Sequence, residues 1–240
     1  MSALMTMILL AALPVPKSAA EIESQLVSKG EPELIEALEN VAKACRGSLR
    51  LVLRDHAGVI AKVDGAAKDG SPKVKKAVLG AARCFRPAAF SGTFARLIGD
   101  ADQTVAAFAL EIASNTRDVA LAPIVLDAEA ARADKCLDDK LDKDTLEACV
   151  WAAYAPSTLL DAAPAPLKAK AAELAVKMLE APSPKIREVA VESLAATKLA
   201  VNAPALAAMI EKEKSKGFST PNDAALVKRF ETRLKALKGG

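Results

Sequence analysis

The chain has 240 residues and a nearly balanced charge, with 33 Lys and Arg against 30 Asp and Glu, or +3 at pH 7. Hydrophobic residues make up 52% of it but aromatic residues only 3%. Much of the apolar content is Ala, the best helix former, whose small side chain lets neighbouring helices pack closely. No segment alternates apolar and polar residues as a strand does, and no Gly/Ser-rich linker divides the chain, so a sheet protein is excluded and one all-helical body is favoured.

The first 20 residues have the features of a secretory signal peptide. An apolar run over residues 4–13 is followed by two prolines, and Ser18 and Ala20 then stand at −3 and −1 of a cleavage site. The run is too short to span a membrane, so no integral membrane span is expected in the mature chain. We expect cleavage after Ala20 and a periplasmic or secreted protein. Because no Lys or Arg precedes the run, the alternative is an uncleaved helix packed on the first repeat of a cytoplasmic protein.

Six amphipathic helices recur along the rest of the chain, and "SPKIREVAVESLAA" (183–196) shows the pattern most clearly. Ser183 suits the N-cap, and Pro184 takes the first helical position, where a missing N–H costs nothing. An apolar stripe of three residues spaced by four then faces one way. The stripe occurs at Leu34, Leu38 and Ala42; Val74, Val78 and Ala82; Val105, Ala109 and Ala113; Leu146, Val150 and Tyr154; Ile186, Ala190 and Leu194; and Leu226, Phe230 and Leu234.

The spacing of these helices is close to constant. The first residues of successive stripes are 40, 31, 41, 40 and 40 residues apart. Start signals recur with them: Pro32, Pro72 and Pro184 lie two residues before their stripes, and Ser71, Asp102, Ser183 and Asp223 lie three before. A lone amphipathic helix says little, but six capped ones at one period indicate internal repeats.

Further helices are expected between them, apolar at helical spacing and ending near Gly, Pro or a charged turn. They cover residues 56–68, 87–99, 118–137, 166–180 and 203–215. Helix–turn–helix units that cannot bury their own faces alone must stack. We therefore predict an all-α, right-handed α-solenoid of about six repeats, forming a single domain over residues 21–240.

Two of the predicted second helices carry a recognisable form. "SPKIREVAVESLAA" and "SPKVKKAVLGAARC" (71–84) fit P-x-[VI]-[RK]-x-x-A-[VA] and resemble the second helix of a HEAT or HEAT-like repeat. The resemblance covers nearly all of residues 21–240, and it implies an architecture rather than an activity, since such repeats serve as scaffolds, adaptors and occasionally enzymes. The 40-residue period and the single Trp and Tyr argue against tetratricopeptide repeats.

The four cysteines suit an oxidising compartment. Cys136 and Cys149 flank the charged turn "LDDKLDKD", so an antiparallel helix pair places them side by side within reach of a disulfide. Cys45 and Cys84 end corresponding helices of the first two repeats and are the second candidate pair. The alternative is that all four are small buried hydrophobic residues. With no C-x₂-C pair and a single His, a zinc site is not expected.

Basic residues follow the stripes on several second helices, which are expected to line the concave surface of the solenoid. The candidate binding residues there are Lys75, Lys76, Arg187, Lys228 and Arg229. Glu147, Ala106 and Ile35 interrupt this series, so a continuous track for phosphates, and hence nucleic acid as a partner, is not expected. A solvated face is the simpler interpretation.

No catalytic constellation is found, and no catalytic, cofactor-binding or metal-binding residue is assigned. His56 lies beside Asp55 without a nucleophile, so a surface His is expected rather than a general base. The acidic turn residues lack the alternation and central Gly of an EF-hand loop and are expected to form a solvated turn; they are Asp134, Asp138, Asp139, Asp142 and Asp144. There is no Gly-rich phosphate loop.

Two classes of function remain. The first is a non-enzymatic, exported scaffold that binds a protein or peptide on its concave surface. The second is a HEAT-like enzyme or enzyme-associated protein, resembling phycobilin lyases or DNA glycosylases. Base chemistry needs aromatic faces and a polar, enclosed pocket, and the chain offers only Trp151 and Tyr154, the latter on a predicted core stripe. We therefore favour the scaffold.

Overall fold

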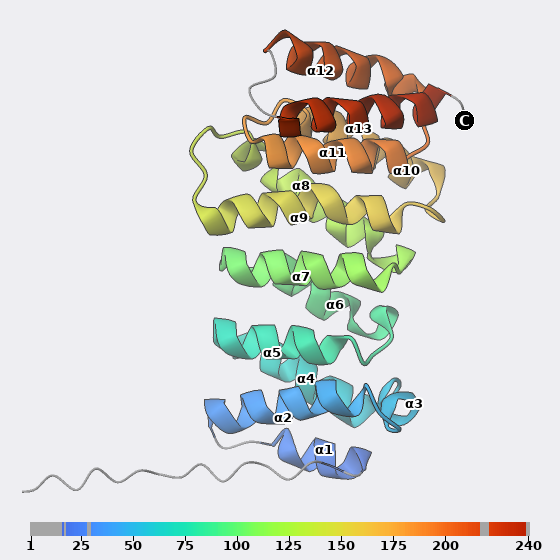
Figure 1. Ribbon diagram of the computed structural model, residues 1–240. Coiled ribbons are helices and arrows are strands. Elements are labelled where there is room, and N and C mark those ends of the chain that lie inside the picture. The colour runs from blue at the N-terminus through green and yellow to red at the C-terminus, as the bar shows by residue number, and fades with distance from the viewer. Residues whose placement is uncertain (1–15, 17, 28–29, 217–220, 239–240) are drawn as a thin grey trace, which may run out of the picture. The chain divides into compact units, whose positions relative to one another are not determined.

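The computed structural model describes residues 16, 18–27, 30–216 and 221–238. Every regular element in these ranges is a helix (Figure 1). The chain forms two compact units, residues 1–86 and 87–240, called here the first and second units. The single domain expected over 21–240 stays a prediction, and most of the expected signal peptide lies outside the described residues.

The described part of the first unit consists of helices in antiparallel pairs. α1 contacts both α2 and α4, α4 lies against α5, and α2 lies against α5, so the second helix of one pair stacks on the second helix of the next. The elements are α1 (Ala19–Gln25), α2 (Glu31–Ala44), the short α3 (Arg50–Leu53), α4 (Ala57–Asp69) and α5 (Pro72–Ala82).

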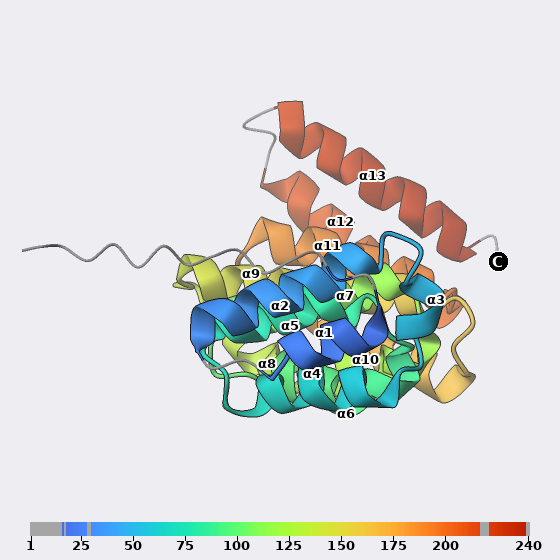
Figure 2. The same ribbon diagram turned by 90° about the horizontal axis from the view of Figure 1, so that it is seen from below.

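The second unit repeats this arrangement in two layers. α7, α9, α11 and α13 stack on one another in chain order (Figure 1), whereas α6, α8 and α10 form the other layer (Figure 2). The elements are α6 (Pro87–Ile98), α7 (Gln103–Thr116), the 3₁₀ turn η1 (Val119–Leu121), α8 (Ala122–Cys136), α9 (Lys143–Leu159), α10 (Ala165–Met178), α11 (Pro184–Ala196), the 3₁₀ turn η2 (Ala200–Asn202), α12 (Ala203–Ser215) and α13 (Pro221–Lys238). The all-α solenoid is therefore confirmed, with helix pairs where the sequence predicts them.

Most of the helix-start signals work as expected. Ser71 accepts the amide of Val74 at 3.4 Å, and Asp102 accepts two amides of the first turn of α7. Pro184 is the first residue of α11, but the hydroxyl of Ser183 makes no capping bond. The expectation for α13 was wrong, since this helix begins at Pro221, two residues before Asp223. A proline again takes the first helical position there, which its fixed φ suits.

The predicted stripes of α5, α7 and α11 are buried in full. The stripe predicted for α9 is buried only in part: Leu146 and Val150 are half-buried and pack against an apolar cluster, Tyr154 is half-buried on the groove side, and the fully buried face includes Cys149 and Ala153. α9 is the helix against which α7, α8 and α11 all pack. Three close neighbours favour the face with the smallest side chains, so Ala and Cys are fully buried and the larger residues lie at the margin of the core.

One buried residue of the second unit is a carboxylic acid without a partner. Glu129 of α8 is fully buried between Leu126 and Ala133, which belong to different apolar clusters. Neither of its oxygens has a hydrogen-bond partner within the described residues. Burial raises the pKa of Glu129 to about 8, because a charge there would be desolvated. Arg132, one turn later, instead donates to the carbonyl oxygens of Ile98 and Ala128.

In the described part of the chain, no helix combines the length and the apolar character that a membrane span requires.

Candidate binding groove on the second helices

Two turns of the second unit share a sequence pattern that lies outside the helical stripes. "TRDVALAP" (116–123) joins α7 to α8, and "TKLAVNAP" (197–204) joins α11 to α12, so both fit T-[RK]-x₄-A-P. In each turn the Thr hydroxyl donates to the carbonyl three residues earlier and accepts the amide two residues later. A 3₁₀ turn and an Ala-Pro helix start follow in both. The same chain geometry is thus built twice, two repeats apart.

The residue after each Thr is a cation in the left-handed backbone region. Arg117 has φ 54° and Lys198 has φ 57°, and they are the only non-glycine residues with positive φ in the described ranges. This conformation costs an L-residue roughly 1–2 kcal/mol. Glycine avoids that cost and is the usual residue at such helix ends. Long basic side chains therefore stand where backbone geometry alone favours Gly.

Both cations line one groove, which runs across the ends of α7, α9 and α11 and reaches α13. Its volume is about 1040 Å³, at the upper end of the range for ligand sites. The groove forms at the edge of the layer of second helices, because these helices stack side by side and end at the same edge. The lining residues are Thr116, Arg117, Asp118, Val119, Tyr154, Ser157, Thr158, Leu159, Asp161, Ala162, Glu192, Ala195, Ala196, Lys198, Arg233 and Ala236.

Most of the charges in the groove are paired with one another. Lys198 lies 2.8 Å from Asp161, and its ammonium group lowers the pKa of that carboxyl, first through the hydrogen bond and then through its charge. Arg233 of α13 lies 2.7 Å from Glu192 of α11. Arg117 differs from these, because its exposed guanidinium makes no ion pair or side-chain hydrogen bond within the described residues. It is the cation that the groove leaves available.

The groove also presents polar groups that no other described residue uses. The hydroxyl of Tyr154 and that of Ser157 have no hydrogen-bond partner among the described residues, and both side chains are half-buried. Trp151 packs edge-on against Tyr154, with ring centroids 5.7 Å apart. This contact fixes the tyrosine ring on the groove wall, which corrects its predicted place on the core stripe. An aromatic face with a free hydroxyl is well suited to recognition.

Hydroxyl groups beside the groove join the second helices of successive repeats. Thr158 of α9 donates to the Ser114 carbonyl of α7 at 3.0 Å. Ser193 of α11 donates to the carbonyl of Ala153, three residues before Pro156 in α9. These two bonds join second helices of successive repeats, α7 to α9 and α9 to α11. The second helices are thereby fixed at the point where the groove crosses them.

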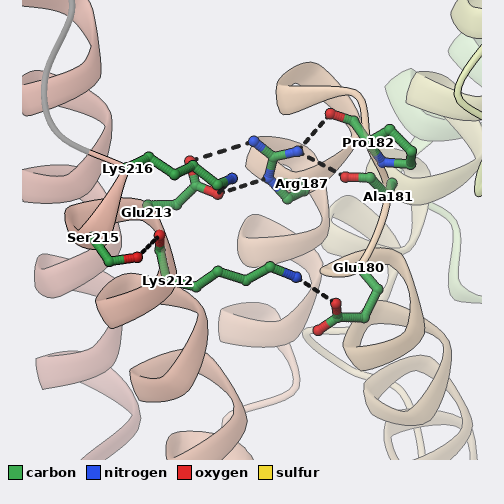
Figure 3. A network of polar contacts seen from close by, with 8 residues as sticks. All are labelled: Glu180, Ala181, Pro182, Arg187, Lys212, Glu213, Ser215 and Lys216. Atoms are coloured by element: carbon green, nitrogen blue, oxygen red, sulfur yellow. Dashed lines mark hydrogen bonds and ion pairs between the residues drawn. The ribbon is translucent and has the colours of Figure 1, made fainter.

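Arg187, one of the predicted surface cations, is instead an internal residue of the second unit (Figure 3). It is 8% exposed and donates to the carbonyl oxygens of Ala181 and Pro182, both at 2.7 Å. Its guanidinium also lies 3.1 Å from Glu213 of α12. Burial would raise the pKa of Glu213, but the hydrogen bond from Lys216 and the charge of Arg187 together hold it below the ordinary value. Arg187 therefore ties α11 to the preceding turn and to α12.

The other predicted surface cations lie on helices of different units. Lys75 and Lys76 are half-buried on α5 of the first unit. Lys228 and Arg229 are exposed on α13 of the second unit, and Arg229 lies 2.6 Å from Glu188 of α11. None of these residues lines the groove. Their role in binding stays a prediction, and Arg229 has a partner from the neighbouring repeat.

The structure brings both predicted cysteine pairs to disulfide distance. The Cα atoms of Cys136 and Cys149 are 5.6 Å apart, across the charged turn between α8 and α9. Those of Cys45 and Cys84 are 5.4 Å apart, within the first unit. No cysteine of the chain is left over. Covalent links of this kind form in oxidising compartments.

Helix caps account for two of the polar residues considered above. His56 is the N-cap of α4, and its Nδ1 accepts the amide of Val59 at 3.3 Å. Asp142 caps α9, and hydrogen bonds from Thr145 and Asp144 lower its pKa. Among the described residues, no three His, Cys, Asp or Glu side chains gather as a metal site would require.

Comparison with known proteins supports the fold. No family model and no curated protein matches the chain. An engineered protein solved by a structural-genomics consortium superposes with a TM-score of 0.63 at 17% identity, covering 91% of this chain and 96% of the other. A designed armadillo repeat protein gives a TM-score of 0.59 at 21% identity, covering 90% of this chain and 98% of the other. The chain thus has the fold of a helical repeat solenoid, and its HEAT character stays a prediction.

Proposed function

We propose that this protein is a non-enzymatic interaction scaffold that binds an extended segment of a partner protein in the groove on its second helices. The observation that carries the proposal is the pair of left-handed cations. Arg117 and Lys198 occupy positions where Gly would fold at lower cost, and both face the groove. Unfavourable backbone conformations of this kind tend to be kept where a side chain serves a function.

The chemistry of the groove suits a peptide better than a small apolar ligand. A peptide backbone offers a donor and an acceptor at every residue, and the groove offers free hydroxyl groups on Tyr154 and Ser157 beside apolar alanine surface. Its internal ion pairs neutralise most of its charge. The remaining cation, Arg117, is suited to a carboxylate of the partner, which it can hold through two parallel hydrogen bonds.

Two features of the chain support a location outside the cytoplasm. The two cysteine pairs at disulfide distance suit an oxidising compartment, and we propose that residues 1–20 are removed as a signal peptide. The mature chain would then be a single domain of HEAT-like repeats over residues 21–240. Mass spectrometry of the native protein is expected to find its N-terminus at Glu21, whereas an intact Met1 would contradict export.

The binding proposal can be tested by selecting segments from a random peptide library on the full chain. Selected peptides are expected to share an acidic position and to lose most of their affinity for Tyr154→Ala and Arg117→Gln. Lys185→Gln removes an exposed cation of α11 that does not line the groove and serves as the matched control. Peptides that bind all four proteins equally would place the binding surface elsewhere and contradict the proposal.

A further inference from the structure

A second surface, independent of the groove, protrudes from the first unit. Between α2 and α4 the chain forms a loop around the short helix α3, at the edge of this unit (Figure 1). Leu51 and Val52 are adjacent on α3 and are 78% and 54% exposed, two of the four large hydrophobic side chains that are exposed within the described residues. We call residues 46–54 the α3 protrusion.

The protrusion is held in place from below, so its apolar side chains are presented outward. Leu53 is completely buried and anchors α3 to the first unit. Because successive helical residues are rotated by about 100°, a buried Leu53 turns Leu51 toward solvent. Cys45, immediately before the protrusion, lies at disulfide distance from Cys84 at the end of α5. This arrangement fixes the base of the protrusion and leaves its tip apolar.

The charge of the protrusion is strongly positive and uncompensated. Arg46, Arg50 and Arg54 are all exposed, and none forms an ion pair within the residues that the structure describes. The nearest acidic residue in the sequence, Asp55, is bound to Arg86 at 2.7 Å. Residues 46–54 contain no acidic side chain. Apolar side chains and free arginines thus lie together on one small projecting element.

We propose that the α3 protrusion docks the protein on an anionic phospholipid surface. Apolar side chains enter the boundary between headgroups and acyl chains, and arginines at the same level bind lipid phosphates. The size of the surface favours a lipid over a folded protein, because a stable protein interface needs about 800 Å² on each partner. A projecting tip of two apolar residues cannot supply that area against a protein, but a fluid bilayer closes around it on all sides.

The test uses the full chain and vesicles of phosphatidylcholine, with or without 30% phosphatidylglycerol, in a sedimentation assay. Binding is expected to the anionic vesicles only and to weaken with added salt. Each arginine contributes about fivefold to such binding. Replacing Arg46, Arg50 and Arg54 by Gln is therefore expected to weaken it on the order of a hundredfold. Replacing Leu51 and Val52 by Ser is expected to weaken it about tenfold or more.

Matched controls separate the proposal from general charge effects. Lys140, Lys143 and Lys185 are exposed cations of the second unit whose joint replacement by Gln changes the net charge equally. Val201→Ser removes an 80% exposed apolar residue elsewhere. Both controls are expected to bind anionic vesicles as the wild type does, and circular dichroism checks that every variant folds. Absence of binding, equal binding to neutral vesicles, or undiminished binding of the Leu51 and Val52 variant would overturn the proposal, the last by showing a surface for polyanions in general.

Discussion

Among the described residues of the second unit, two charged residues, Arg187 and Glu129, are buried, and their surroundings differ. Arg187 keeps its charge because two backbone carbonyl oxygens and the carboxylate of Glu213 surround it. Glu129 has neither a counter-ion nor a hydrogen bond among the described residues and is held neutral by desolvation. The difference shows that a buried charge persists here only where a turn supplies backbone acceptors. It also predicts that Glu129 makes the stability of the protein depend on pH.

The largest expected effect is the pH dependence caused by Glu129. Its pKa rises from 4.5 to about 8 on folding, so the folded state holds a proton that the unfolded state releases above pH 4.5. The free energy of unfolding is therefore expected to fall as pH rises from 4.5 to 8, by roughly 4–5 kcal/mol at about 1.4 kcal/mol per pKa unit. Urea titrations at pH 5 and pH 9 measure this difference.

Glu129→Gln is the matched variant, because it keeps the shape and removes the titration. Its stability is expected to change much less between pH 5 and pH 9 than that of the wild type. An unchanged pH dependence in this variant would show that another group causes the effect. Glu213 acts in the opposite direction: its lowered pKa contributes stability above the unfolded value, which is lost as pH falls below 4.5.

The next largest loss of stability is expected from removing the buried guanidinium of Arg187. Arg187→Met leaves the Glu213 carboxylate without its arginine and two carbonyl oxygens without donors, so a loss of about 3 kcal/mol is expected. The control is Arg229→Met, which breaks the exposed ion pair between Arg229 of α13 and Glu188 of α11. That change is expected to cost at most about 1 kcal/mol. Equal losses in the two variants would contradict the structural role assigned to Arg187.

A comparable loss of stability is expected from removing the cysteine pair that joins α8, the helix of Glu129, to α9. Replacing Cys136 and Cys149 by Ala releases a loop whose closure is worth about 3 kcal/mol in the chain-entropy model. Because each helix pair contacts only its neighbours, hydrogen exchange is expected to quicken first in residues 120–155. Water would then reach Glu129 more readily, and the pH dependence of stability would shrink. Exchange that quickens uniformly along the chain would argue against this local effect.

Much of the fold could be predicted from the sequence, because caps, prolines and apolar spacing act locally. The stripes of α5, α7 and α11 are buried as the pattern predicts. The pattern held only in part in α9, where packing against three helices buries the small residues fully and Tyr154 lies on the groove instead of in the core. Local periodicity cannot show how many neighbours a helix has, and that number decides which face is buried.

The candidate site was harder to predict than the fold, for a related reason. Arg187 follows the first residue of an apolar stripe, a position from which the sequence predicts an exposed side chain. In the structure, carbonyl oxygens of the turn before α11 accept hydrogen bonds from it and it is buried. Arg117 and Lys198 lie in turns, where helical periodicity carries no signal. The repeated T-[RK]-x₄-A-P pattern was present in the sequence and would have marked both positions. Their left-handed φ values are the reason to assign them a function, and these values are known only from the folded backbone.

The central claim is that Arg117 and Lys198 are kept in a costly conformation because they bind a partner. The direct test replaces both by Gly and measures the free energy of unfolding and the affinity for a peptide selected on the wild type. Removing the left-handed strain is expected to leave stability unchanged or to raise it by up to about 1 kcal/mol per site, while affinity falls at least tenfold. Unchanged affinity, or a loss of stability that parallels the loss of affinity, would contradict the claim.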